Sequence, residues 1–580
     1  MDSTGFDKHL VAQAQQLLHR GRVDLALDQL SPALTSAALM PNSLKLLARL
    51  ALREQRMPLA GQALQRVLQE TPDDAEAHAL MAASAKLTGD PELLERAARR
   101  ALSLDHAQPL ATALLVEHLR DGLRLTEALQ LASRCLKQHP DDWGTRLARA
   151  DLWQFAGEAD AAEADALRAA QVSNSLQAKQ SACMNMLYRD EPSAEQVLER
   201  HVRLGAAIPP IKMPLRPRTP YRPGLRPLRV GLLSADLRRH PVGTFVEPLL
   251  SAWDRQRIVP VCYSDATADA TTARLRGYCA EWHDVRGEPD VRVMQRVQDD
   301  AIDVLIDLGG HTFGSRPQLL SSRCAPLQLT YLGYLFDTGL AGCDGVIGDA
   351  ATLPEGSRSA RRPLRLPGSF LCHLPSAQAP PVVERAADIA PTFGSFNHLA
   401  KLSPQTVALW SRVLNAVPHS RLVLCALGLA DAGVRDRVRA RFAAQGLDPG
   451  RLELRPPNTD PTGFLAQYAD IDIALDPLPF NGGTTTLQAL WQGVPVITCP
   501  GERMAARSGL SILGAAGLSQ LIARDHDQFV AIACALGRDL VARQELRQTL
   551  RQRLVDAGMT DARRFAEGFA ALLEATVARS

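Results

Sequence analysis

The stretch from Asp476 to Gly493 constrains the fold of this 580-residue chain more than any other. The apolar run 471–475 before it and the run 494–498 after it are typical of buried parallel strands. Between them, the apolar spacing within 487–491 suits a helix. A strand, a helix and a second strand in this order predict a parallel α/β sheet.

The connection between this strand and this helix has the composition of an anion site. Gly482 and Gly483 let the backbone approach a ligand closely, and Thr484, Thr485 and Thr486 fall in the first helical turn. Free N–H groups and the positive end of the helix dipole attract negative charge at such a turn. The turn is therefore predicted to hold a diphosphate, and the alternative is an ordinary connection capped by threonines.

From residue 228 onward, apolar runs alternate with helical segments in two series. The runs are 229–234, 258–263, 302–307 and 328–331 in the first series, and 392–396, 421–424, 471–475 and 494–498 in the second. Such alternation predicts two doubly wound, Rossmann-like parallel sheets. In these sheets ligands bind outside the carboxyl ends of the strands.

Residues 5–205 have apolar spacings of three and four that predict helix after helix. Similar segments begin 34 residues apart, at Thr71, Asp105 and His139. In two of them a proline, Pro72 or Pro140, is expected at the first helical position. A helix pair repeated every 34 residues resembles the tetratricopeptide repeat (TPR), whose copies stack into a superhelix with a concave groove. We expect four or five repeats, and the alternative is an irregular helical bundle.

The seven prolines between residues 206 and 228 exclude a helix or a central strand there and predict an extended connector. The expected domains are helical repeats over 1–205, the connector over 206–228, a first Rossmann-like lobe over 229–380 and a second lobe with C-terminal helices over 381–580.

The composition indicates which classes of partner and which cellular compartment to expect. A net charge of +2 gives no reason to expect nucleic acid or a membrane surface as a partner, and no apolar run approaches the length of a membrane span. The ten cysteines lie singly, without metal-binding spacing, which is typical of buried free thiols in a reducing compartment. We therefore expect a cytoplasmic protein without a metal. Asp470-Ile471-Asp472 matches the Asp-x-Asp motif of metal-dependent transferases, but it begins a buried strand and is interpreted as structural.

Two histidines follow strand ends of the first series. His240 comes after the first strand and His311 after the third, and both are expected to face the cleft between the lobes. A histidine there can accept a proton from a hydroxyl or hold a sugar or phosphate oxygen. The alternative is a histidine that satisfies backbone groups in a tight turn.

The second series offers a cation and an aromatic ring. Lys401 is the only lysine beyond residue 229, and it lies just ahead of the helix start Ser403-Pro404, where it can neutralise a departing phosphate. The alternative is a solvated surface lysine. Phe464, ahead of the 471–475 strand, could stack on a nucleobase, although such a residue is more often part of a core.

Taken in order, six segments resemble the nucleocytoplasmic O-linked N-acetylglucosamine transferase family, glycosyltransferase family 41, with its SPINDLY-like members. The segments are 234–241, 309–312, 325–334, 396–401, 479–486 and 494–507. The resemblance covers nearly the whole chain and implies a TPR superhelix followed by a two-lobe GT-B glycosyltransferase.

The resemblance implies inverting, metal-independent transfer of N-acetylglucosamine from UDP-GlcNAc to Ser or Thr of proteins, with no cofactor beyond the nucleotide sugar. It also implies protein acceptors bound in the repeat groove, and a second copy of the chain is a further expected partner through the repeats. Three alternatives stay open: O-fucosyl transfer from GDP-fucose, N-glucosyl transfer from UDP-glucose, and a TPR scaffold with a degenerate transferase region.

The resemblance also assigns roles by position. It implies catalytic roles for His240, His311 and Lys401, with the lysine on the leaving diphosphate, and it implies nucleotide-sugar contacts for His398, Phe464, Gly482, Gly483, Thr484, Thr485 and Gln488. Phe464 stands where many members have a histidine that stacks on uracil. Gln488 stands where the family usually has an acidic residue for the ribose hydroxyls, and this departure leaves the donor open.

Overall fold

The computed structural model describes residues 3–217, 219–385 and 390–579, and it divides into two compact units. The first unit comprises Met1–Trp153 and Asp165–Asn174, and the second comprises Gln154–Ala164 and Ser175–Ser580. Within the described ranges, no helix combines the length and the apolar character that crossing a bilayer requires.

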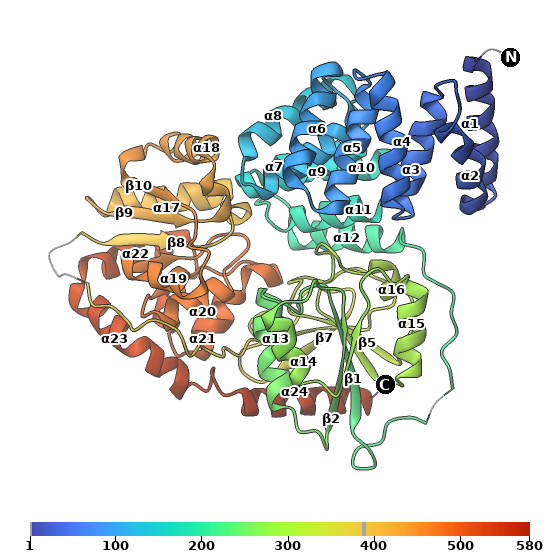
Figure 1. The fold of residues 1–580 in the computed structure, drawn as a ribbon. Helices are drawn as coiled ribbons and strands as arrows, with labels where there is room; N and C mark the ends of the chain where they lie inside the picture. Colours follow the sequence, from blue (N-terminus) through green and yellow to red (C-terminus); the bar gives the residue numbers. More distant parts are fainter. Residues whose placement is uncertain (1–2, 218, 386–389, 580) are drawn as a thin grey trace. The chain divides into compact units, whose positions relative to one another are not determined.

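Successive helix pairs, coloured blue to cyan in Figure 1, confirm the predicted repeats. The helices are α1 (Ser3–His19), α2 (Val23–Leu30), α3 (Pro41–Arg53), α4 (Met57–Glu70), α5 (Ala75–Thr88), α6 (Pro91–Leu104), α7 (Pro109–Asp121), α8 (Leu125–Gln138), α9 (Trp143–Ala156) and α10 (Ala159–Val172). Small residues make the close pairing possible, because Ala82 of α5 and Ala98 and Ala101 of α6 are fully buried where these helices pack. The second unit contains the last residues of α9 and the first residues of α10.

Two helix starts differ from the prediction. Pro72 and Pro140 precede their helices by three residues, since α5 begins at Ala75 and α9 at Trp143. Asp74 caps α5 instead, and its carboxylate accepts a hydrogen bond of 2.9 Å from the backbone N–H three residues on. The aspartate carboxylate accepts a hydrogen bond from an N–H of the first helical turn. A proline side chain has no acceptor and cannot do this, so the aspartate determines where the helix begins.

The predicted end of the repeats at residue 205 does not coincide with the boundary between the compact units. Both α11 (Leu176–Met186) and α12 (Ala194–Ala206) belong to the second unit. Beyond α12, the described residues up to 227 form no helix or strand, as their prolines predict.

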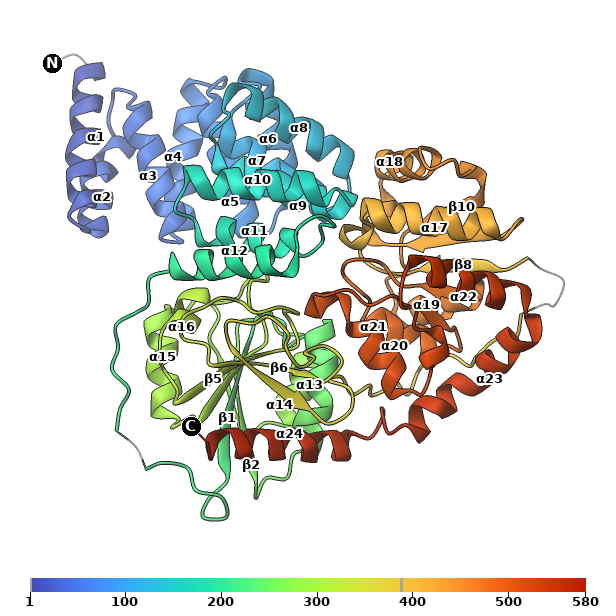
Figure 2. The ribbon, with the colours of Figure 1, turned by 180° about the vertical axis from the view of Figure 1, so that it is seen from behind.

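The first lobe is a seven-stranded sheet whose neighbouring strands all pair in parallel, in the order β3-β2-β1-β4-β5-β6-β7. The strands are β1 (Leu228–Ser234), β2 (Ile258–Ser264), β3 (Glu281–Asp284), β4 (Val304–Asp307), β5 (Leu327–Tyr331), β6 (Gly345–Asp349) and β7 (Arg362–Leu366). The helices are α13 (Pro241–Ala252), α14 (Ala270–Gly277), α15 (Asp290–Asp299) and α16 (Pro317–Ser321). Figures 1 and 2 show α13 and α14 on one face of the sheet and α15 and α16 on the other.

The second lobe is a five-stranded parallel sheet in the order β10-β9-β8-β11-β12. The strands are β8 (Thr392–Ser395), β9 (Arg421–Cys425), β10 (Leu452–Arg455), β11 (Ile473–Leu475) and β12 (Val496–Ile497). The helices are α17 (Pro404–Ala416), α18 (Ala432–Ala443), α19 (Pro461–Ala466), α20 (Thr484–Trp491), α21 (Ser508–Ala515), α22 (His526–Arg538) and α23 (Leu540–Asp556).

Both sheets therefore have the doubly wound order, and in each the winding direction reverses between two central strands. These strands are β1 and β4 in the first lobe and β8 and β11 in the second. Ligands of open α/β sheets bind at this reversal, outside the carboxyl ends of the strands. The fold thus points to the loops that follow these four strands.

The last helix, α24 (Ala562–Val577), returns to the first lobe although it follows the second in sequence. It packs against α13 and β7, and Figure 2 shows it, in red, beside the seven-stranded sheet of the first lobe. Phe569 is fully buried there, edge-on to Tyr331 of β5 and to Trp253. The predicted lobe of residues 381–580 therefore contributes its final helix to the first lobe.

Candidate active site

The reversal point of the second sheet brings a lysine to the predicted anion turn. Lys401 follows β8, and its Nζ donates a hydrogen bond of 2.7 Å to the backbone carbonyl of Asn481, which follows β11. The same Nζ lies 3.5 Å from Asn397 Oδ1, and that oxygen accepts a 2.9 Å hydrogen bond from Thr485 Oγ1. Loops separated by about 80 residues are thus joined through one ammonium group and one amide.

Burial and a nearby carboxylate set the charge of this lysine. Burial lowers the pKa of Lys401 to about 8, and the carboxylate of Asp476 opposes the shift. Burial likewise raises the pKa of Asp476 to about 7, against hydrogen bonds from the Thr498 hydroxyl at 2.6 Å and the Gly482 N–H at 2.6 Å. The ring of Phe480 lies below the ammonium, 4.5 Å from Nζ to the ring centroid. The site therefore holds a cation that is only partly compensated.

The glycine turn is as tightly built as the sequence suggests. A Cβ atom on Gly482 would lie 2.6 Å from Thr486 Oγ1 and 2.7 Å from Thr485 Oγ1, so only glycine fits. A Cβ atom on Gly483 would meet its nearest atom, Leu371 Cδ1, at 3.8 Å, and α20 begins directly after Gly483 at Thr484 with no side-chain cap. Because no side chain caps the helix, the first N–H groups of α20 can donate hydrogen bonds to an anion.

Phe464 belongs to an aromatic cluster beside this turn. Its ring centroid lies 5.9 Å from that of Phe396 and 5.9 Å from that of Tyr468, whose hydroxyl donates a 3.2 Å hydrogen bond to the Thr485 carbonyl. Phe464 is only partly buried, so a stacking role stays a prediction. Gln488 is also partly exposed, four residues after Thr484 on α20.

His240 lies at the reversal point of the first sheet, where it is the N-cap residue of α13. Its Nδ1 accepts a 3.3 Å hydrogen bond from the Val242 N–H and lies 3.7 Å from an Asp236 carboxylate oxygen. Burial lowers its pKa although Asp236 opposes the shift, so the ring is neutral near pH 7. Because Nδ1 accepts, the hydrogen sits on Nε2, and the ring is set to donate a hydrogen bond.

His311 does not face a cleft, which corrects the sequence-based expectation. Its side chain is buried, and its Nε2 donates a 2.7 Å hydrogen bond to the Thr338 carbonyl. Burial lowers the pKa of His311 to about 4, and its ring packs edge-on against Tyr334 and His201. The strand-end position was predicted correctly, but the side chain turns inward and holds the loop in place.

His398 lies directly before the short helix that carries Lys401. Its Nδ1 accepts a 3.2 Å hydrogen bond from the Ala400 N–H, and its ring meets Phe155 edge-on with centroids 5.4 Å apart. Burial, with the Lys401 charge added, lowers the pKa of His398 to about 4. A neutral imidazole beside the lysine is compatible with the predicted nucleotide contact, which stays a prediction.

The comparison with protein families decides the relationship. The sequence model described as Glycosyl transferase family 41 matches residues 209–361 and 385–569, more than half of the chain. The chain belongs to glycosyl transferase family 41. Most of both lobes lies within the matched ranges, and so do Lys401, His240, His311, His398, Phe464, Gln488 and the 482–485 turn.

Curated relatives of this family 41 chain include a probable UDP-N-acetylglucosamine–peptide N-acetylglucosaminyltransferase SPINDLY from Solanum lycopersicum. The two sequences are 36% identical over 349 residues, which is 59% of this chain and 38% of that relative. The protein named SEC from Arabidopsis thaliana is 27% identical over 62% of this chain and 38% of its own length. This chain thus spans about two fifths of these relatives.

A solved structure covers far more of the family 41 chain. A mutant of the Thermobaculum terrenum O-GlcNAc transferase superimposes with a TM-score of 0.80 and 32% identity, over 87% of this chain and 98% of the other. The likeness includes the helical repeats and both lobes, and it confirms the predicted fold class.

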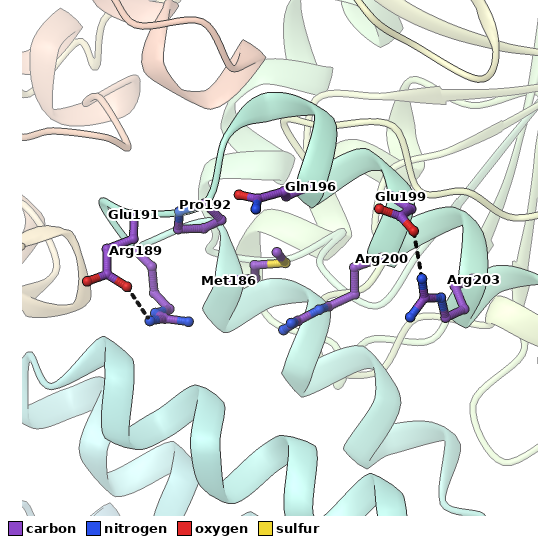
Figure 3. Close-up of a pocket in the computed structure, with 8 residues that line it drawn as sticks. All are labelled: Met186, Arg189, Glu191, Pro192, Gln196, Glu199, Arg200 and Arg203. Atoms are coloured by element: carbon purple, nitrogen blue, oxygen red, sulfur yellow. Dashed lines mark hydrogen bonds and ion pairs between the residues drawn. The ribbon is translucent and has the colours of Figure 1, made fainter.

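One pocket of the family 41 chain is formed by the α11–α12 pair and includes no residue of the anion turn (Figure 3). It has a volume of about 390 Å³ and is lined by Met186, Arg189, Glu191, Pro192, Gln196, Glu199, Arg200 and Arg203. Figure 3 shows ion pairs from Arg189 to Glu191 and from Arg203 to Glu199, and Glu163 pairs with Arg189 and Arg200. Because carboxylates already neutralise these arginines, we do not assign the diphosphate to this pocket.

The carboxylates that resemble a metal site are bound by arginines. Asp472 pairs with Arg385 at 2.8 Å and Asp470 with Arg455 at 2.6 Å, so both carboxylates of the Asp-x-Asp segment are already paired with arginines, and its structural role stays a prediction. Among the described residues, one further group, Glu281, His283 and Asp300, could hold an ion. There the Arg229 guanidinium donates to the Glu281 carboxylate at 2.6 Å and to the Asp300 carbonyl, so a cation would meet a fixed positive charge.

Three residues of the family 41 site were not singled out from the sequence: Asn397, Asp476 and Asn481. Asp476 carries a recognisable signal, because it is a charged residue directly after a buried strand at a sheet reversal. The asparagines carry none of their own, since their contacts to Lys401 and Thr485 arise only when the two loops meet.

Proposed function

We propose that this chain is an inverting, metal-independent protein O-glycosyltransferase that moves N-acetylglucosamine from UDP-GlcNAc to Ser or Thr of proteins. The observation that carries the proposal is the Lys401 ammonium, held between Asn397 and Asn481 beside the uncapped start of α20. The names of the curated relatives and of the superimposed O-GlcNAc transferase support the same donor and acceptor class.

The chemistry follows from where positive charge is available. The acceptor hydroxyl oxygen forms a bond to the anomeric carbon while the bond from that carbon to the diphosphate oxygen breaks. The hydroxyl proton passes to solvent water, and UDP leaves with the electron pair of the broken bond. Lys401 and the N–H groups of Thr484 and Thr485 would stabilise the charge that develops on the diphosphate, which is commonly the largest contribution to such catalysis. This arrangement supplies without a metal the charge that a divalent cation provides elsewhere.

The remaining residues would orient the substrates. His240 would donate from Nε2 to an acceptor or phosphate oxygen, because Nδ1 is engaged by the Val242 N–H. Phe464 would stack on the base and Gln488 would bond a ribose hydroxyl, while His398 would stay neutral beside the phosphates. His311 would support the first-lobe loop without touching substrate.

The first unit would hold the protein acceptor. A groove of about 350 Å³ on it is lined by Lys8, Val11, Ala12, Gln15, Asn42, Lys45, Leu46, Arg49 and Glu76. Its mixed polar and apolar lining suits an extended polypeptide. Self-association through the repeats and a cytoplasmic location belong to the same proposal, and the free cysteines of the chain support the location.

The decisive experiment measures transfer and donor binding together. Purified chain is incubated with peptide acceptors and UDP-GlcNAc, GDP-fucose or UDP-glucose, with and without EDTA, beside Lys401→Ala and Lys401→Arg variants. We expect transfer from UDP-GlcNAc that EDTA does not reduce. Loss of the charge that offsets the leaving diphosphate should lower kcat at least about 100-fold in Lys401→Ala, and Lys401→Arg should recover part of it.

Gln488 gives a specific reason to include the other donors, because it lacks the carboxylate expected for the ribose. Transfer from GDP-fucose or UDP-glucose alone would replace the proposed donor and leave the site intact. Absence of binding and of hydrolysis for all three nucleotide sugars would favour the scaffold. Normal transfer by Lys401→Ala would overturn the assignment of the lysine.

A further inference from the structure

The turn between α11 and α12 reaches into the second lobe at the candidate site. Arg503, which is almost fully buried, donates to the carbonyl of Met186 at 3.3 Å and to that of Arg189 at 2.6 Å. On the other side of the turn, the Asp190 carboxylate accepts a 2.8 Å hydrogen bond from the Gln405 N–H in the first turn of α17. The backbone on both sides of Tyr188 is therefore fixed to the lobe that carries Lys401.

With its backbone fixed in this way, Tyr188 stacks on Phe480, the aromatic ring next to Lys401. Its side chain is buried and lies against Phe480, with ring centroids 5.1 Å apart and planes inclined by 26°. The same Phe480 ring lies 4.5 Å from Lys401 Nζ. Tyr188, Phe480 and Lys401 thus form a continuous stack from the α11–α12 turn to the candidate diphosphate site.

The stack matters because a lysine side chain is long and flexible. Two acceptors, the Asn481 carbonyl and Asn397 Oδ1, direct the ammonium from one side, and the aromatic ring stabilises its charge through the π-face. Offset-stacked aromatic pairs hold each other in a preferred geometry, so Tyr188 restricts where Phe480 can lie. A shift of the ammonium by about 1 Å is enough to weaken a catalytic contact severely.

We propose that Tyr188 is a positioning residue that fixes the Lys401 ammonium through Phe480. This inference rests on the proposed function of Lys401 at the leaving diphosphate. It adds a residue from the α11–α12 turn, 213 positions before the lysine in the chain, to the group that determines the rate of transfer. The tyrosine hydroxyl is not needed for this role, since the stacked ring does the positioning.

The test compares Tyr188→Leu, Phe480→Leu and Tyr188→Phe in the full chain. For Tyr188→Leu and Phe480→Leu we expect kcat to fall about tenfold with a smaller change in KM for the donor, since the lysine acts on developing charge. Tyr188→Phe keeps the stack and should retain kcat within about twofold. Phe442→Leu, at a fully buried phenylalanine of α18, is the matched control that should lower Tm but not kcat.

A second arm separates positioning from general packing. In a Lys401→Ala background, Tyr188→Leu should cause no further loss of kcat, because the group that it positions is already absent. A full further loss there, or unchanged kcat in Tyr188→Leu alone, would overturn the inference while the role of Lys401 stands. Normal transfer by Lys401→Ala would instead remove the proposed function on which the inference rests.

Discussion

At the residue scale, the charge of Lys401 gives the site a pH dependence. Burial lowers the pKa of the lysine to about 8 in the free protein, so a rise in pH through this value removes the ammonium that the leaving diphosphate requires. We predict that kcat/KM for the donor falls on the alkaline side with a limb near pH 8, because this parameter reports the ionisation of the free enzyme. Initial rates between pH 6 and pH 10 measure the limb.

The neighbouring carboxylate tests the origin of that limb. Asp476 raises the pKa of Lys401, so the isosteric Asp476→Asn variant should move the alkaline limb to lower pH. Thr330→Val, which removes a buried hydroxyl in the first lobe, should leave the limb in place and serves as the control. An unmoved limb in Asp476→Asn would show that another group produces it.

The two first-lobe histidines show how far residues can be placed from the sequence. Both loops were correctly expected at strand ends, because an apolar run followed by glycine or a helix start marks those ends. The orientation of each ring depends on contacts that no local pattern encodes. His311 turns toward the Thr338 carbonyl 27 residues later, whereas His240 meets its own helix two residues on.

At the element scale, α12 is held on the first lobe by two glycines in backbone contact. A Cβ on Gly205 of α12 would lie 2.3 Å from the Gly339 carbonyl oxygen, and a Cβ on Gly339 would lie 2.3 Å from the His201 carbonyl oxygen. We predict that Gly205→Ala destabilises the second unit by about 1–3 kcal/mol, since the backbone must move apart. Calorimetric unfolding of the full chain measures the change.

A second helical glycine supplies the matched control. Gly61 of α4 has no atom within 4 Å of its would-be Cβ, so Gly61→Ala gains helix propensity without a clash. That variant should be more stable by about 0.5–1 kcal/mol. Equal effects of the two substitutions would contradict a steric role for Gly205.

The strands that the sequence did not reveal lack a continuous apolar run. β6 is an interior, buried strand, but Gly345 and Gly348 interrupt its apolar residues, and the other three are edge strands. Strands β3 and β7 lie at the two edges of the first sheet, and several of their residues are partly exposed or exposed. β10 is likewise an edge strand of the second sheet. Interior strands such as β1 and β4 were predicted because both their faces are buried and their sequences are continuously apolar.

At the scale of the whole molecule, sequence order and spatial order diverge at both ends of the second unit. α24 leaves the second lobe and covers the first, where Arg257 pairs with Glu574 at 2.7 Å and Phe569 packs on Tyr331. α11 and α12 look like further repeats by composition, but they pack on the loops of both lobes. Composition and periodicity cannot separate such helices from repeats, because the apolar spacing is the same whichever surface covers it.

Because α11 and α12 pack on the lobes and the repeats before α9 belong to the first unit, two N-terminal truncations should have opposite outcomes. A domain boundary at residue 205 would predict the same outcome for both. Removal of residues 1–142 keeps α9 to α12 whole, and with them the 2.6 Å hydrogen bonds that Gln180 donates to Ser315 and that the Tyr334 hydroxyl donates to His201. This variant should stay folded and transfer sugar to a short peptide at near the full rate. Its transfer to whole proteins should fall, because the proposed acceptor groove is gone.

Removal of residues 1–206 also deletes α11 and α12, and exposes the apolar side chains of Tyr334, Phe336 and Phe480 that they cover. The Gln405 N–H loses its Asp190 acceptor as well. We expect this longer truncation to aggregate or to lose peptide transfer entirely, as measured by size-exclusion chromatography and initial rates. A folded, active product would show that α11 and α12 are dispensable, and it would remove the structural reason for assigning them to the catalytic unit.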